Sequence, residues 1–403
     1  MTFAIGVEEV PNSRIPDGWT VNPLGTLLRE IPKYGINAAA VSYDQSYPTY
    51  LRITDISDDG RFNQSNIASV NHPLASKYLL AQGDLVFART GASVGKSYLH
   101  QGIDQDPLVY AGFLIKVSTD TRKLSASYLF HFTHSDSYWR WVKQNSMRSG
   151  QPGINSQEYA SLPVLLPPLC EQEAIAEALN DADAYIKSLE QLLIKKRDLK
   201  QAVMQALLTG KTRLPGFSEP WLSGPLEDIA ILKNGYAFKS SSYEQFGNFN
   251  IVTIANVQDG FMDHQEFSKI GSIPVDVQRH QLLECNDILI SMTGNVGRVC
   301  KVDFQNCLLN QRVGKLIPHN INRNFLFQSL KQKSFSASMM AKATGGAQGN
   351  LKSSHILEEI VMYPSSSDEQ SAIASILDDM DAEISEIKLM RDKATAVKQG
   401  MMQ

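Results

Sequence analysis

Apolar residues recur at alternating spacings of four and three in two stretches of the chain, the spacing that is typical of a coiled coil. The first stretch contains Ile175, Leu179, Ala182, Ile186, Leu189 and Leu193, and the second contains Ile373, Leu377, Met380, Ile384 and Ile387. The pattern predicts a helix that begins just after Pro167-Pro168 and ends at Gly210. It predicts another that begins at Ser366 or Ser367, where Ser366 and Glu369 would form a capping box, and that continues to the end of the chain.

A helix over 171–208 would be about 57 Å long. Packed on its twin, it would form a rigid spacer. The alternative is that each helix packs only on its own domain. Both stretches lose the regular spacing at matching places, which in the first stretch is at Lys196. This match favours two helices packed on each other.

The two helices belong to a duplication that extends over most of the chain. The 16 residues from Glu171 recur from Glu369 with ten identities, and Trp19 recurs as Trp221. The duplication predicts two similar binding surfaces, an arrangement suited to a bipartite target. Because Arg14-Ile15-Pro16 resembles Arg213-Leu214-Pro215, which follows the first helix, we also expect the two termini to lie near each other.

The remaining sequence predicts mixed domains that each precede one long helix. The β-rich runs are Tyr50–Ile56, Leu85–Ala88, Phe113–Val117 and Ile288–Ser291, and the helical runs are Tyr128–Val142 and Asn324–Ala341. The predicted fold class is α+β, with two similar mixed α/β domains separated by two long helices. The predicted boundaries are 1–160 and 216–360 for the domains, and 161–215 and 361–403 for the helical regions.

The composition is that of an ordinary globular protein, with 43% hydrophobic and 20% charged residues among 403. The four cysteines are irregularly spaced, and neither a hydrophobic leader nor a membrane-length apolar run is present in the sequence. We therefore expect a cytoplasmic protein without a structural metal or a membrane partner.

Basic residues are unevenly distributed, although the net charge is −4. Seven bases and no acids occur between Asp303 and Glu358, namely Arg312, Lys315, Arg323, Lys331, Lys333, Lys342 and Lys352. A smaller group, Arg140, Lys143 and Arg148, lies between Asp136 and Glu158. Such stretches can approach DNA phosphates, and the alternative is a chance fluctuation.

Nucleotide hydrolysis and catalysis are disfavoured by the motifs. Thr90-Gly91 with Val94-Gly95-Lys96-Ser97 resembles a P-loop, but Thr90 stands where that motif has its first glycine, and we expect a strand rather than a helix after Lys96. The second copy, Thr293-Gly294 with Val296-Gly297-Arg298, lacks the lysine and the hydroxyl. Asn22-Pro23-Leu24-Gly25 lacks the residues with which an amino-methyltransferase holds a flipped base. His131 and His134 have no metal-binding partners in the sequence and are expected on a helix surface.

Two loops in each half are better candidates for DNA contact. Loops 148–155 and 344–351 combine glycines with Gln and Asn, which can pair with adenine, and each follows a basic segment; the alternative is an ordinary connector. The glycine loops that retain a base in both copies, Lys96 and Arg298, are the other candidates. The predicted DNA-binding residues are Arg89, Thr90, Ser93, Lys96, Arg148, Gln151, Thr293, Asn295, Arg298, Lys342, Gln348 and Asn350.

Together these motifs resemble the specificity subunit of type I restriction–modification systems. The resemblance rests on Pro167-Pro168-Leu169-Cys170-Glu171-Gln172 with Ile175, on Leu207-Leu208-Thr209-Gly210-Lys211, on the Arg89–Lys96 loop and on Tyr110-Ala111-Gly112-Phe113. The second copy keeps Glu369-Gln370 and Ile373 but lacks the two prolines and the second Leu-Thr-Gly-Lys ending, which raises the question of a shortened last helix.

The resemblance implies two target-recognition domains, each recognising one half of an interrupted double-stranded DNA site, and antiparallel helices that set the gap. It implies that two modification subunits bind this chain and methylate adenine, and that restriction subunits join them to cleave DNA. S-adenosylmethionine, ATP and Mg²⁺ would then be bound by those partners, and this chain would be non-catalytic. The alternatives are the recognition subunit of a system with fused methylation and cleavage partners (type IIB-like), and a coiled-coil adaptor that binds proteins only.

Overall fold

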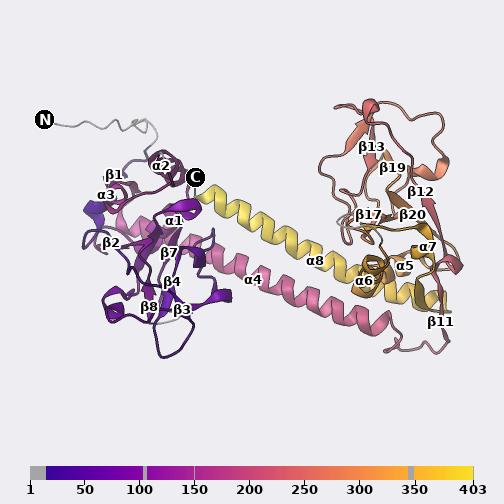
Figure 1. Cartoon of the computed structure of the whole chain (residues 1–403), viewed down its shortest axis with the longest axis horizontal. Coiled ribbons are helices and arrows are strands. Elements are labelled where there is room, and N and C mark those ends of the chain that lie inside the picture. The colour runs from indigo at the N-terminus through magenta and orange to yellow at the C-terminus, as the bar shows by residue number, and fades with distance from the viewer. Residues whose placement is uncertain (1–14, 103–106, 149, 344–348, 403) are drawn as a thin grey trace. The chain divides into compact units, whose positions relative to one another are not determined.

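The computed structural model describes residues 15–102, 107–148, 150–343 and 349–402, which form two compact units. The first unit comprises Met1–Glu190 with Met390–Gln403, and the second comprises Gln191–Leu389. Each unit contains one mixed α/β domain together with a part of both long helices, α4 (Leu169–Leu207) and α8 (Ser367–Met401) (Figure 1). The predicted fold class is therefore confirmed.

Both long helices begin where the sequence predicts. Helix α4 starts directly after Pro167-Pro168, and its last turn is closed by a hydrogen bond from the amide of Thr212 to the carbonyl of Ala206 (3.1 Å), with Gly210 at φ +67°. This left-handed glycine explains the Thr-Gly-Lys sequence at this point as a helix end. Helix α8 starts at Ser367, and the hydroxyl of Ser366 accepts from the amide of Glu369 (3.4 Å).

The described residues of the first domain form two four-stranded sheets and one two-stranded sheet. The first sheet has the order β2 (Lys33–Tyr34), β9 (Leu114–Ser118), β6 (Asp84–Ala88), β7 (Ser97–Leu99). The second has the order β3 (Val41–Ser42), β5 (Ala68–Ser69), β4 (Thr49–Leu51), β8 (Leu108–Tyr110). Strands β1 (Thr20–Pro23) and β10 (Pro163–Leu166) pair at the point where the domain joins α4.

The second domain repeats the strand order of the first sheet, and its second sheet differs in one edge strand. Its sheets are β12 (Ala230–Asn234), β20 (Val313–Pro318), β16 (Ile288–Ser291), β18 (Val299–Lys301), and β14 (Ser268–Ile270), β13 (Phe249–Val252), β19 (Cys307–Leu309), β15 (Leu282–Leu283). Two pairs complete it, β11 (Trp221–Pro225) with β22 (Ile360–Pro364) and β17 (Thr293–Gly294) with β21 (Gly349–Asn350). A parallel strand pairing recurs in both domains, β4 with β8 and β13 with β19, as a duplication requires.

The shorter helices are more broken than the sequence predicts. The single run 128–142 is two helices, α1 (Ala126–Phe132) and α2 (Asp136–Asn145), because the Ser135 hydroxyl caps α2 by accepting from the amide of Tyr138. The run 324–341 is likewise α5 (Arg323–Leu330) and α6 (Lys333–Lys342). Two five-residue helices, α3 (Ser156–Ala160) and α7 (Ser353–Leu357), follow the loops near 150 and 350. The β run at 50–56 ends at Leu51, after which residues 53–55 form a 3₁₀ turn.

Each domain has its own apolar core. In the first domain, the stacked rings of Phe87 and Tyr159 lie 4.4 Å apart between the sheet and α3, and both side chains are fully buried. In the second domain, Ile290 and Leu326 occupy the corresponding core with Met339. No helix in the described part of the chain contains an apolar stretch that could cross a lipid bilayer.

The Glu-Gln pair that opens each long helix fixes the helix to its domain. The buried amide of Gln172 accepts from the amide of Ser125, the N-cap of α1 (2.9 Å), and donates to the carbonyls of Lys123 and Pro167. Gln370 does the same in the second unit, accepting from the amide of Asn322, the N-cap of α5 (2.7 Å). A glutamine can satisfy both a donor and acceptors at once, which accounts for its presence in both copies.

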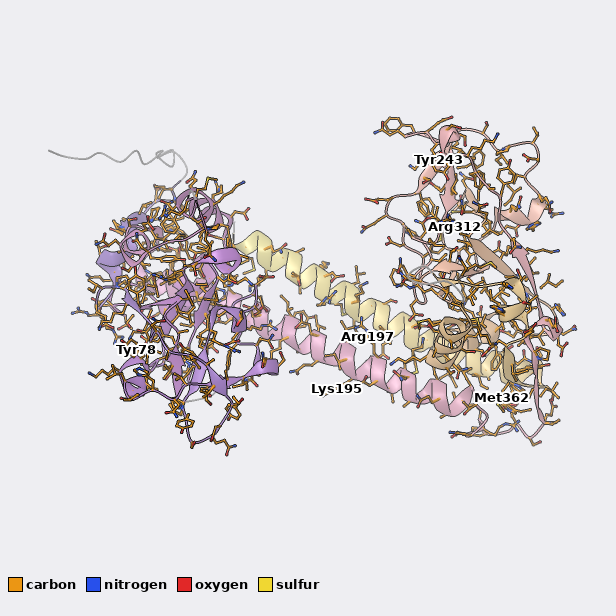
Figure 2. All side chains as sticks on the ribbon, viewed as in Figure 1. Tyr78, Lys195, Arg197, Tyr243, Arg312 and Met362 are labelled. Carbon is orange, nitrogen blue, oxygen red and sulfur yellow. The ribbon has the colours of Figure 1, made fainter. Side chains whose placement is uncertain are left out.

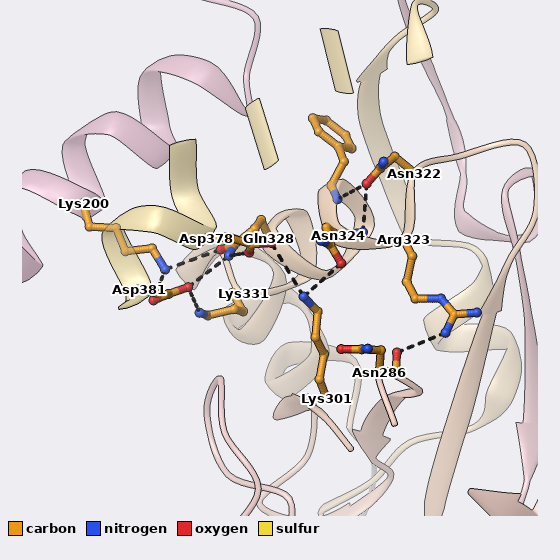
Figure 3. Close-up of polar contacts among 11 residues, drawn as sticks. Lys200, Asn286, Lys301, Asn322, Arg323, Asn324, Gln328, Lys331, Asp378 and Asp381 are labelled. Carbon is orange, nitrogen blue, oxygen red and sulfur yellow. Dashed lines mark hydrogen bonds and ion pairs between the residues drawn. The ribbon is translucent and has the colours of Figure 1, made fainter. Parts of the chain in front are cut away.

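Within each unit the two long helices run antiparallel, and an equivalent Lys–Asp pair joins them. In the first unit Lys398 of α8 contacts Asp183 of α4 (2.6 Å), and in the second unit Lys200 of α4 contacts Asp381 of α8. Lys331 also contacts Asp381 at 2.8 Å (Figure 3). Lys398 and Asp183 belong to the unit that contains the first domain, so the C-terminal residues pack with the N-terminal domain; residues 1–14 lie outside the described part.

Candidate nucleic-acid interface

The two loops predicted for DNA contact meet in each domain. In the first domain, Thr90 and Gly153 form a β-bridge, and the amide of Gly91 donates to the carbonyl of Pro152 (2.9 Å). In the second domain, β17 and β21 pair Thr293 with Asn350. The sequence placed these loops about 60 residues apart, and the fold makes them one surface.

A third segment completes this surface in each domain. It is the turn between β8 and β9 in the first domain and the turn between β19 and β20 in the second. The carbonyl of Phe113 accepts from the amide of Arg89, and the carbonyl of Arg312 accepts from the amide of Met292, at 3.0 Å in both cases. We call these three segments the loop frame. It comprises 89–91, 111–113 and 152–154 in the first domain, and 292–294, 310–312 and 349–351 in the second.

The repeated glycines have structural roles. Gly95 lies at φ +92° and Gly297 at φ +77°, in the left-handed region that favours glycine. A Cβ atom at Gly95 would lie 2.7 Å from Cγ1 of Val142 in α2, and one at Gly297 would lie 2.6 Å from Cβ of Met339 in α6. These glycines let the loop approach the helices that support it. The segment after Lys96 is strand β7, as the sequence predicts, and this differs from the helix of a P-loop.

The basic residue that follows the second glycine of each glycine loop is held by an interaction inside its own domain. Lys96 forms an ion pair with Asp58 (2.7 Å), and Arg298 donates to the side chain of Gln258 (2.6 Å). Asp58 and Gln258 occupy equivalent turns, so the duplication has kept a connection between two loops. This contact gives the repeated base a structural role that the sequence did not indicate.

The other predicted DNA-binding residues differ in their accessibility. Arg148 pairs with Glu158, and Lys342 pairs with Glu359. The exposed ones are Gln151, Asn295 and Asn350, and the half-buried ones are Arg89, Thr90, Ser93 and Thr293. Gln348 lies outside the described residues.

The acid-free stretch of the second domain is partly neutralised from elsewhere in the chain. Lys315 pairs with Asp287 (2.5 Å) and Lys331 with Asp381, in addition to the Lys342–Glu359 pair. Arg312, Lys333 and Lys352 are exposed, and their side chains make no hydrogen bond or ion pair with any residue that the structure describes. Of these three, Arg312 is in the loop frame; Figure 2 marks its position in the second domain.

Sequence reasoning missed the exposure of several side chains on the loop frame and beside it. Phe113 is 54% exposed, and Tyr34, which is 40% exposed, has the guanidinium of Arg89 4.8 Å from its ring centroid. In the second domain the turn exposes Gln311 and Arg312. For Phe113 the one available signal was a large residue directly after the tight turn at Gly112, a position that strand propensity assigned to the β-rich run 113–117. Arg312 was noted only as one of the bases in the acid-free stretch.

The predicted coiled-coil residues are mostly buried. Leu179, Ile186, Leu189 and Leu193 of α4 and Ile373, Leu377 and Ile387 of α8 are at most 7% exposed, and Ile175, Met380 and Ile384 are half-buried. Where the spacing slips, Lys196 pairs with Glu383 (2.5 Å) and Lys200 with Asp381. The slip therefore coincides with polar contacts between the helices.

The expectation that His131 and His134 lie on a helix surface was wrong. His131 is 3% exposed, and its Nε2 is 2.9 Å from the side-chain oxygen of Asn180 in α4. Burial lowers the pKa values of both histidines. Among the described residues, no group of His, Cys, Asp and Glu side chains is arranged to hold a metal ion.

The fold and the duplicated surface define a protein with two related α/β domains on antiparallel helices. The family model of the type I restriction modification DNA specificity domain matches residues 29–196 and again 218–393. The chain belongs to this family.

Individual relatives span most of the chain. It is 23% identical over 397 residues to the type I restriction enzyme MjaVIII specificity subunit of Methanocaldococcus jannaschii, covering 93% of this chain and 88% of that protein. It is 23% identical to the type I restriction enzyme EcoKI specificity subunit of Escherichia coli K12, covering 87% and 80%.

Solved structures show the same fold. The type I restriction–modification system S subunit from M. genitalium matches with a TM-score of 0.62 at 16% identity, covering 97% of this chain and 96% of that one. A chain from a structural study of assembly and conformational transition in the type I system matches with a TM-score of 0.55 at 16% identity, covering 96% and 97%.

Proposed function

We propose that this chain is the DNA-recognition subunit of a type I restriction–modification complex, and that each domain recognises one half of an interrupted site. The observation that supports this most is the duplicated loop frame. Its backbone hydrogen bonds recur in both domains, while its exposed side chains differ between them. Two surfaces with the same backbone and different side chains suit a target with two unlike halves.

The long helices provide the surface for the catalytic partners in this proposal. Leu192 and Leu199 of α4 are 38% and 51% exposed and lie seven residues apart. Met390 and Val397, at the equivalent positions of α8, are 43% and 55% exposed. Apolar residues exposed at a seven-residue interval suit the packing of a further helix. We assign these positions to two modification subunits, one for each copy of the repeat.

Exposed cations flank these apolar positions on α4. Lys195 and Arg197 project from the helix (Figure 2).

Restriction subunits would join the complex through the modification subunits. We propose that the complex acts in the cytoplasm.

Methylation and cleavage belong to the partners in this proposal. S-adenosylmethionine, ATP and Mg²⁺ would be bound by the modification and restriction subunits, and this chain would direct them to the site. The residues of the loop frame suit DNA contact, with Thr, Gln, Asn, Arg and aromatic side chains, and the target adenine would be flipped into a partner's pocket.

The test is to co-express the chain with its modification subunit and to map methylated adenines across the host genome. We expect one interrupted motif. Binding of the purified complex to a DNA duplex with that motif should weaken steeply between 50 and 200 mM salt, on the order of 10³-fold or more. A stable complex with neither a motif nor salt-dependent binding would favour the protein adaptor.

A further inference from the structure

We propose that Arg312 is a base-recognition residue of the second domain and selects a G·C pair in the major groove, and that Phe113 occupies the equivalent position in the first domain. The inference rests on the proposed function and assigns a specific role to one position of the loop frame.

The equivalence of the two positions follows from the backbone. Phe113 and Arg312 each end the turn that precedes an inner strand, β9 or β20, and each accepts through its carbonyl from the glycine-loop segment at 3.0 Å. The turns close identically, since the amides of Leu114 and Val313 donate to Ala111 and Asn310 at 2.8 and 2.9 Å.

The loop frame holds this position firmly. The amide of Ile154 donates to the carbonyl of Arg89 (2.9 Å), and the amide of Arg89 donates to the carbonyl of Phe113. Arg89 therefore links the second loop to the turn that carries Phe113. Leu351 and Met292 repeat the contact at 2.8 Å. In the second domain the side-chain oxygen of Asn310 also accepts from the amide of Arg312 (3.2 Å). A base-recognition residue needs a fixed backbone, because a bidentate contact tolerates little displacement.

The Arg312 guanidinium is free to bind a ligand. It is exposed and makes no hydrogen bond or ion pair with the described residues, whereas Arg298 and Lys315 are held by Gln258 and Asp287. An arginine presents parallel N–H donors that match the O6 and N7 acceptors of guanine. The exposed Gln311 and Asn350 on the same frame give this surface further hydrogen-bonding side chains.

The first domain presents different chemistry at the equivalent place. Phe113 is exposed there, and the nearby Tyr34 ring lies against Arg89. An exposed phenylalanine can contact the methyl group of thymine but donates no hydrogen bond. We therefore expect the two positions to select different base pairs in the two halves of the site.

The experiment compares the adenine-methylation motif of the wild-type complex with those of Arg312→Gln, Arg312→Lys and Phe113→Ala. Arg312→Gln should make one G·C position in one half of the motif degenerate, reducing a preference of roughly 5- to 150-fold to within a few-fold, and should leave the other half unchanged. Phe113→Ala should relax one position in the other half only.

Arg312→Lys separates base recognition from phosphate contact. A lysine keeps the charge and loses the parallel donors, so degeneracy at the same G·C position supports base recognition. If Arg312→Lys keeps the full motif and Arg312→Gln lowers methylation evenly at all sites, Arg312 contacts only the backbone and the inference is overturned. An unchanged motif in Arg312→Gln also overturns it.

The matched control is Arg323→Gln, which removes an exposed arginine of the same domain outside the loop frame. Arg323 donates to the carbonyl of Asn286 (3.3 Å) (Figure 3). This variant should keep the wild-type motif. If the wild-type complex itself yields no motif, the proposed function fails and the inference fails with it. If the wild-type complex yields a motif and Arg312→Gln leaves it intact, the inference is overturned and the proposed function is not affected.

Discussion

At the residue scale, the duplication separates side chains that hold the fold from side chains that are free to bind. Lys96 and Arg298 were candidates for DNA contact because both copies retain a base there, yet each is held by a neighbouring turn. Their partners Asp58 and Gln258 lie about 40 residues away, and no local pattern indicates such a contact. Arg312, whose counterpart in the first copy is Phe113, is an exposed cation on the loop frame whose side chain makes no hydrogen bond or ion pair with the residues that the structure describes.

The structural role of the second glycine can be tested by Gly95→Ala. A side chain there combines a left-handed backbone with a Cβ atom 2.7 Å from Val142. We expect a loss of about 2–4 kcal/mol in the free energy of unfolding. The matched control is Gly83→Ala, since Gly83 has φ +88° and nothing within 4 Å of its Cβ position. It should lose only about 1–2 kcal/mol, the backbone cost. Urea unfolding measures both, and equal losses would contradict the packing role of Gly95.

The buried His131 predicts a pH dependence of stability. Burial lowers its pKa in the folded protein below the ordinary 6.5, and the charge of Lys398 acts in the same direction, whereas the hydrogen bond to the side-chain oxygen of Asn180 and the charge of Asp183 oppose the shift. As the pH falls below about 6.5, the unfolded chain takes up the proton first, so the folded state loses stability. Above that pH the contribution is fully present.

The variant His131→Gln introduces the residue found at the equivalent Gln328. It should reduce the fall in melting temperature between about pH 6.5 and pH 5.5. Part of the fall should remain, because burial lowers the pKa of His134 as well. Thermal unfolding at several pH values measures it, and identical pH profiles for the variant and wild type would rule out a role for His131.

At the element scale, the long helices could be predicted and the short ones could not. Heptad spacing, the two prolines and Gly210 are local signals, and α4 starts directly after Pro168. The break between α1 and α2 depends on Ser135 capping a new helix inside an otherwise helical pattern. The break in the apolar spacing was visible in the sequence, but the polar contacts between the helices that coincide with it were not. They are the pairs Lys196–Glu383 and Lys200–Asp381, and Lys398–Asp183 in the other copy.

The two Lys–Asp pairs differ in a way that predicts unequal mutational effects. Asp381 also contacts Lys331 (2.8 Å) and accepts from Gln328 (2.9 Å), whereas Lys398 is the only cation that contacts Asp183 among the described residues. Burial alone would raise the pKa of Asp381, but the charge of Lys331 and the hydrogen bonds from Gln328, Lys200 and Lys331 hold it below its usual value. Burial, together with Lys331, lowers the pKa of Lys200 to about 8.

Lys398→Met should therefore destabilise the protein more than Lys200→Met, because it leaves Asp183 without a cation. Double-mutant cycles with Asp183→Asn and Asp381→Asn should give coupling energies of about 1–3 kcal/mol for the first pair and less for the second. Chemical unfolding measures each variant. Equal couplings would mean that Lys331 does not compensate for the loss of Lys200.

At the scale of the whole molecule, the internal repeat was the strongest sequence signal. It predicted two similar domains and two long helices, and the shared parallel pairing of β4 with β8 and of β13 with β19 confirms the duplication at the level of topology. The loop frame could be predicted only in part. Its two loops were found because both copies are rich in glycine, but the third segment carries Phe113 in one copy and Arg312 in the other, so comparing the copies gave no common residue to notice.

The equivalence of the two domains predicts that one can replace the other. Each begins and ends in a two-stranded sheet, β1 with β10 or β11 with β22, and each fixes its following helix through Gln172 or Gln370. A chain in which Trp19–Pro167 replaces Trp221–Pro364 keeps these junctions, because Trp19 matches Trp221 and the carbonyls of Pro167 and Pro364 each accept from the glutamine of the following helix. The imported His131 would take the place of Gln328 beside Asp378.

Such a chain should direct methylation to a motif in which the half recognised by the first domain occurs twice and the other half is absent. This outcome follows from the proposal that base selection resides in the side chains of each loop frame and that the helices contribute none of it. Methylation mapping of the chimeric complex beside the wild type measures this. Persistence of the original second half would place its recognition outside Trp221–Pro364, in the helices or in the partner subunits, and would contradict the assignment of one half-site to each domain.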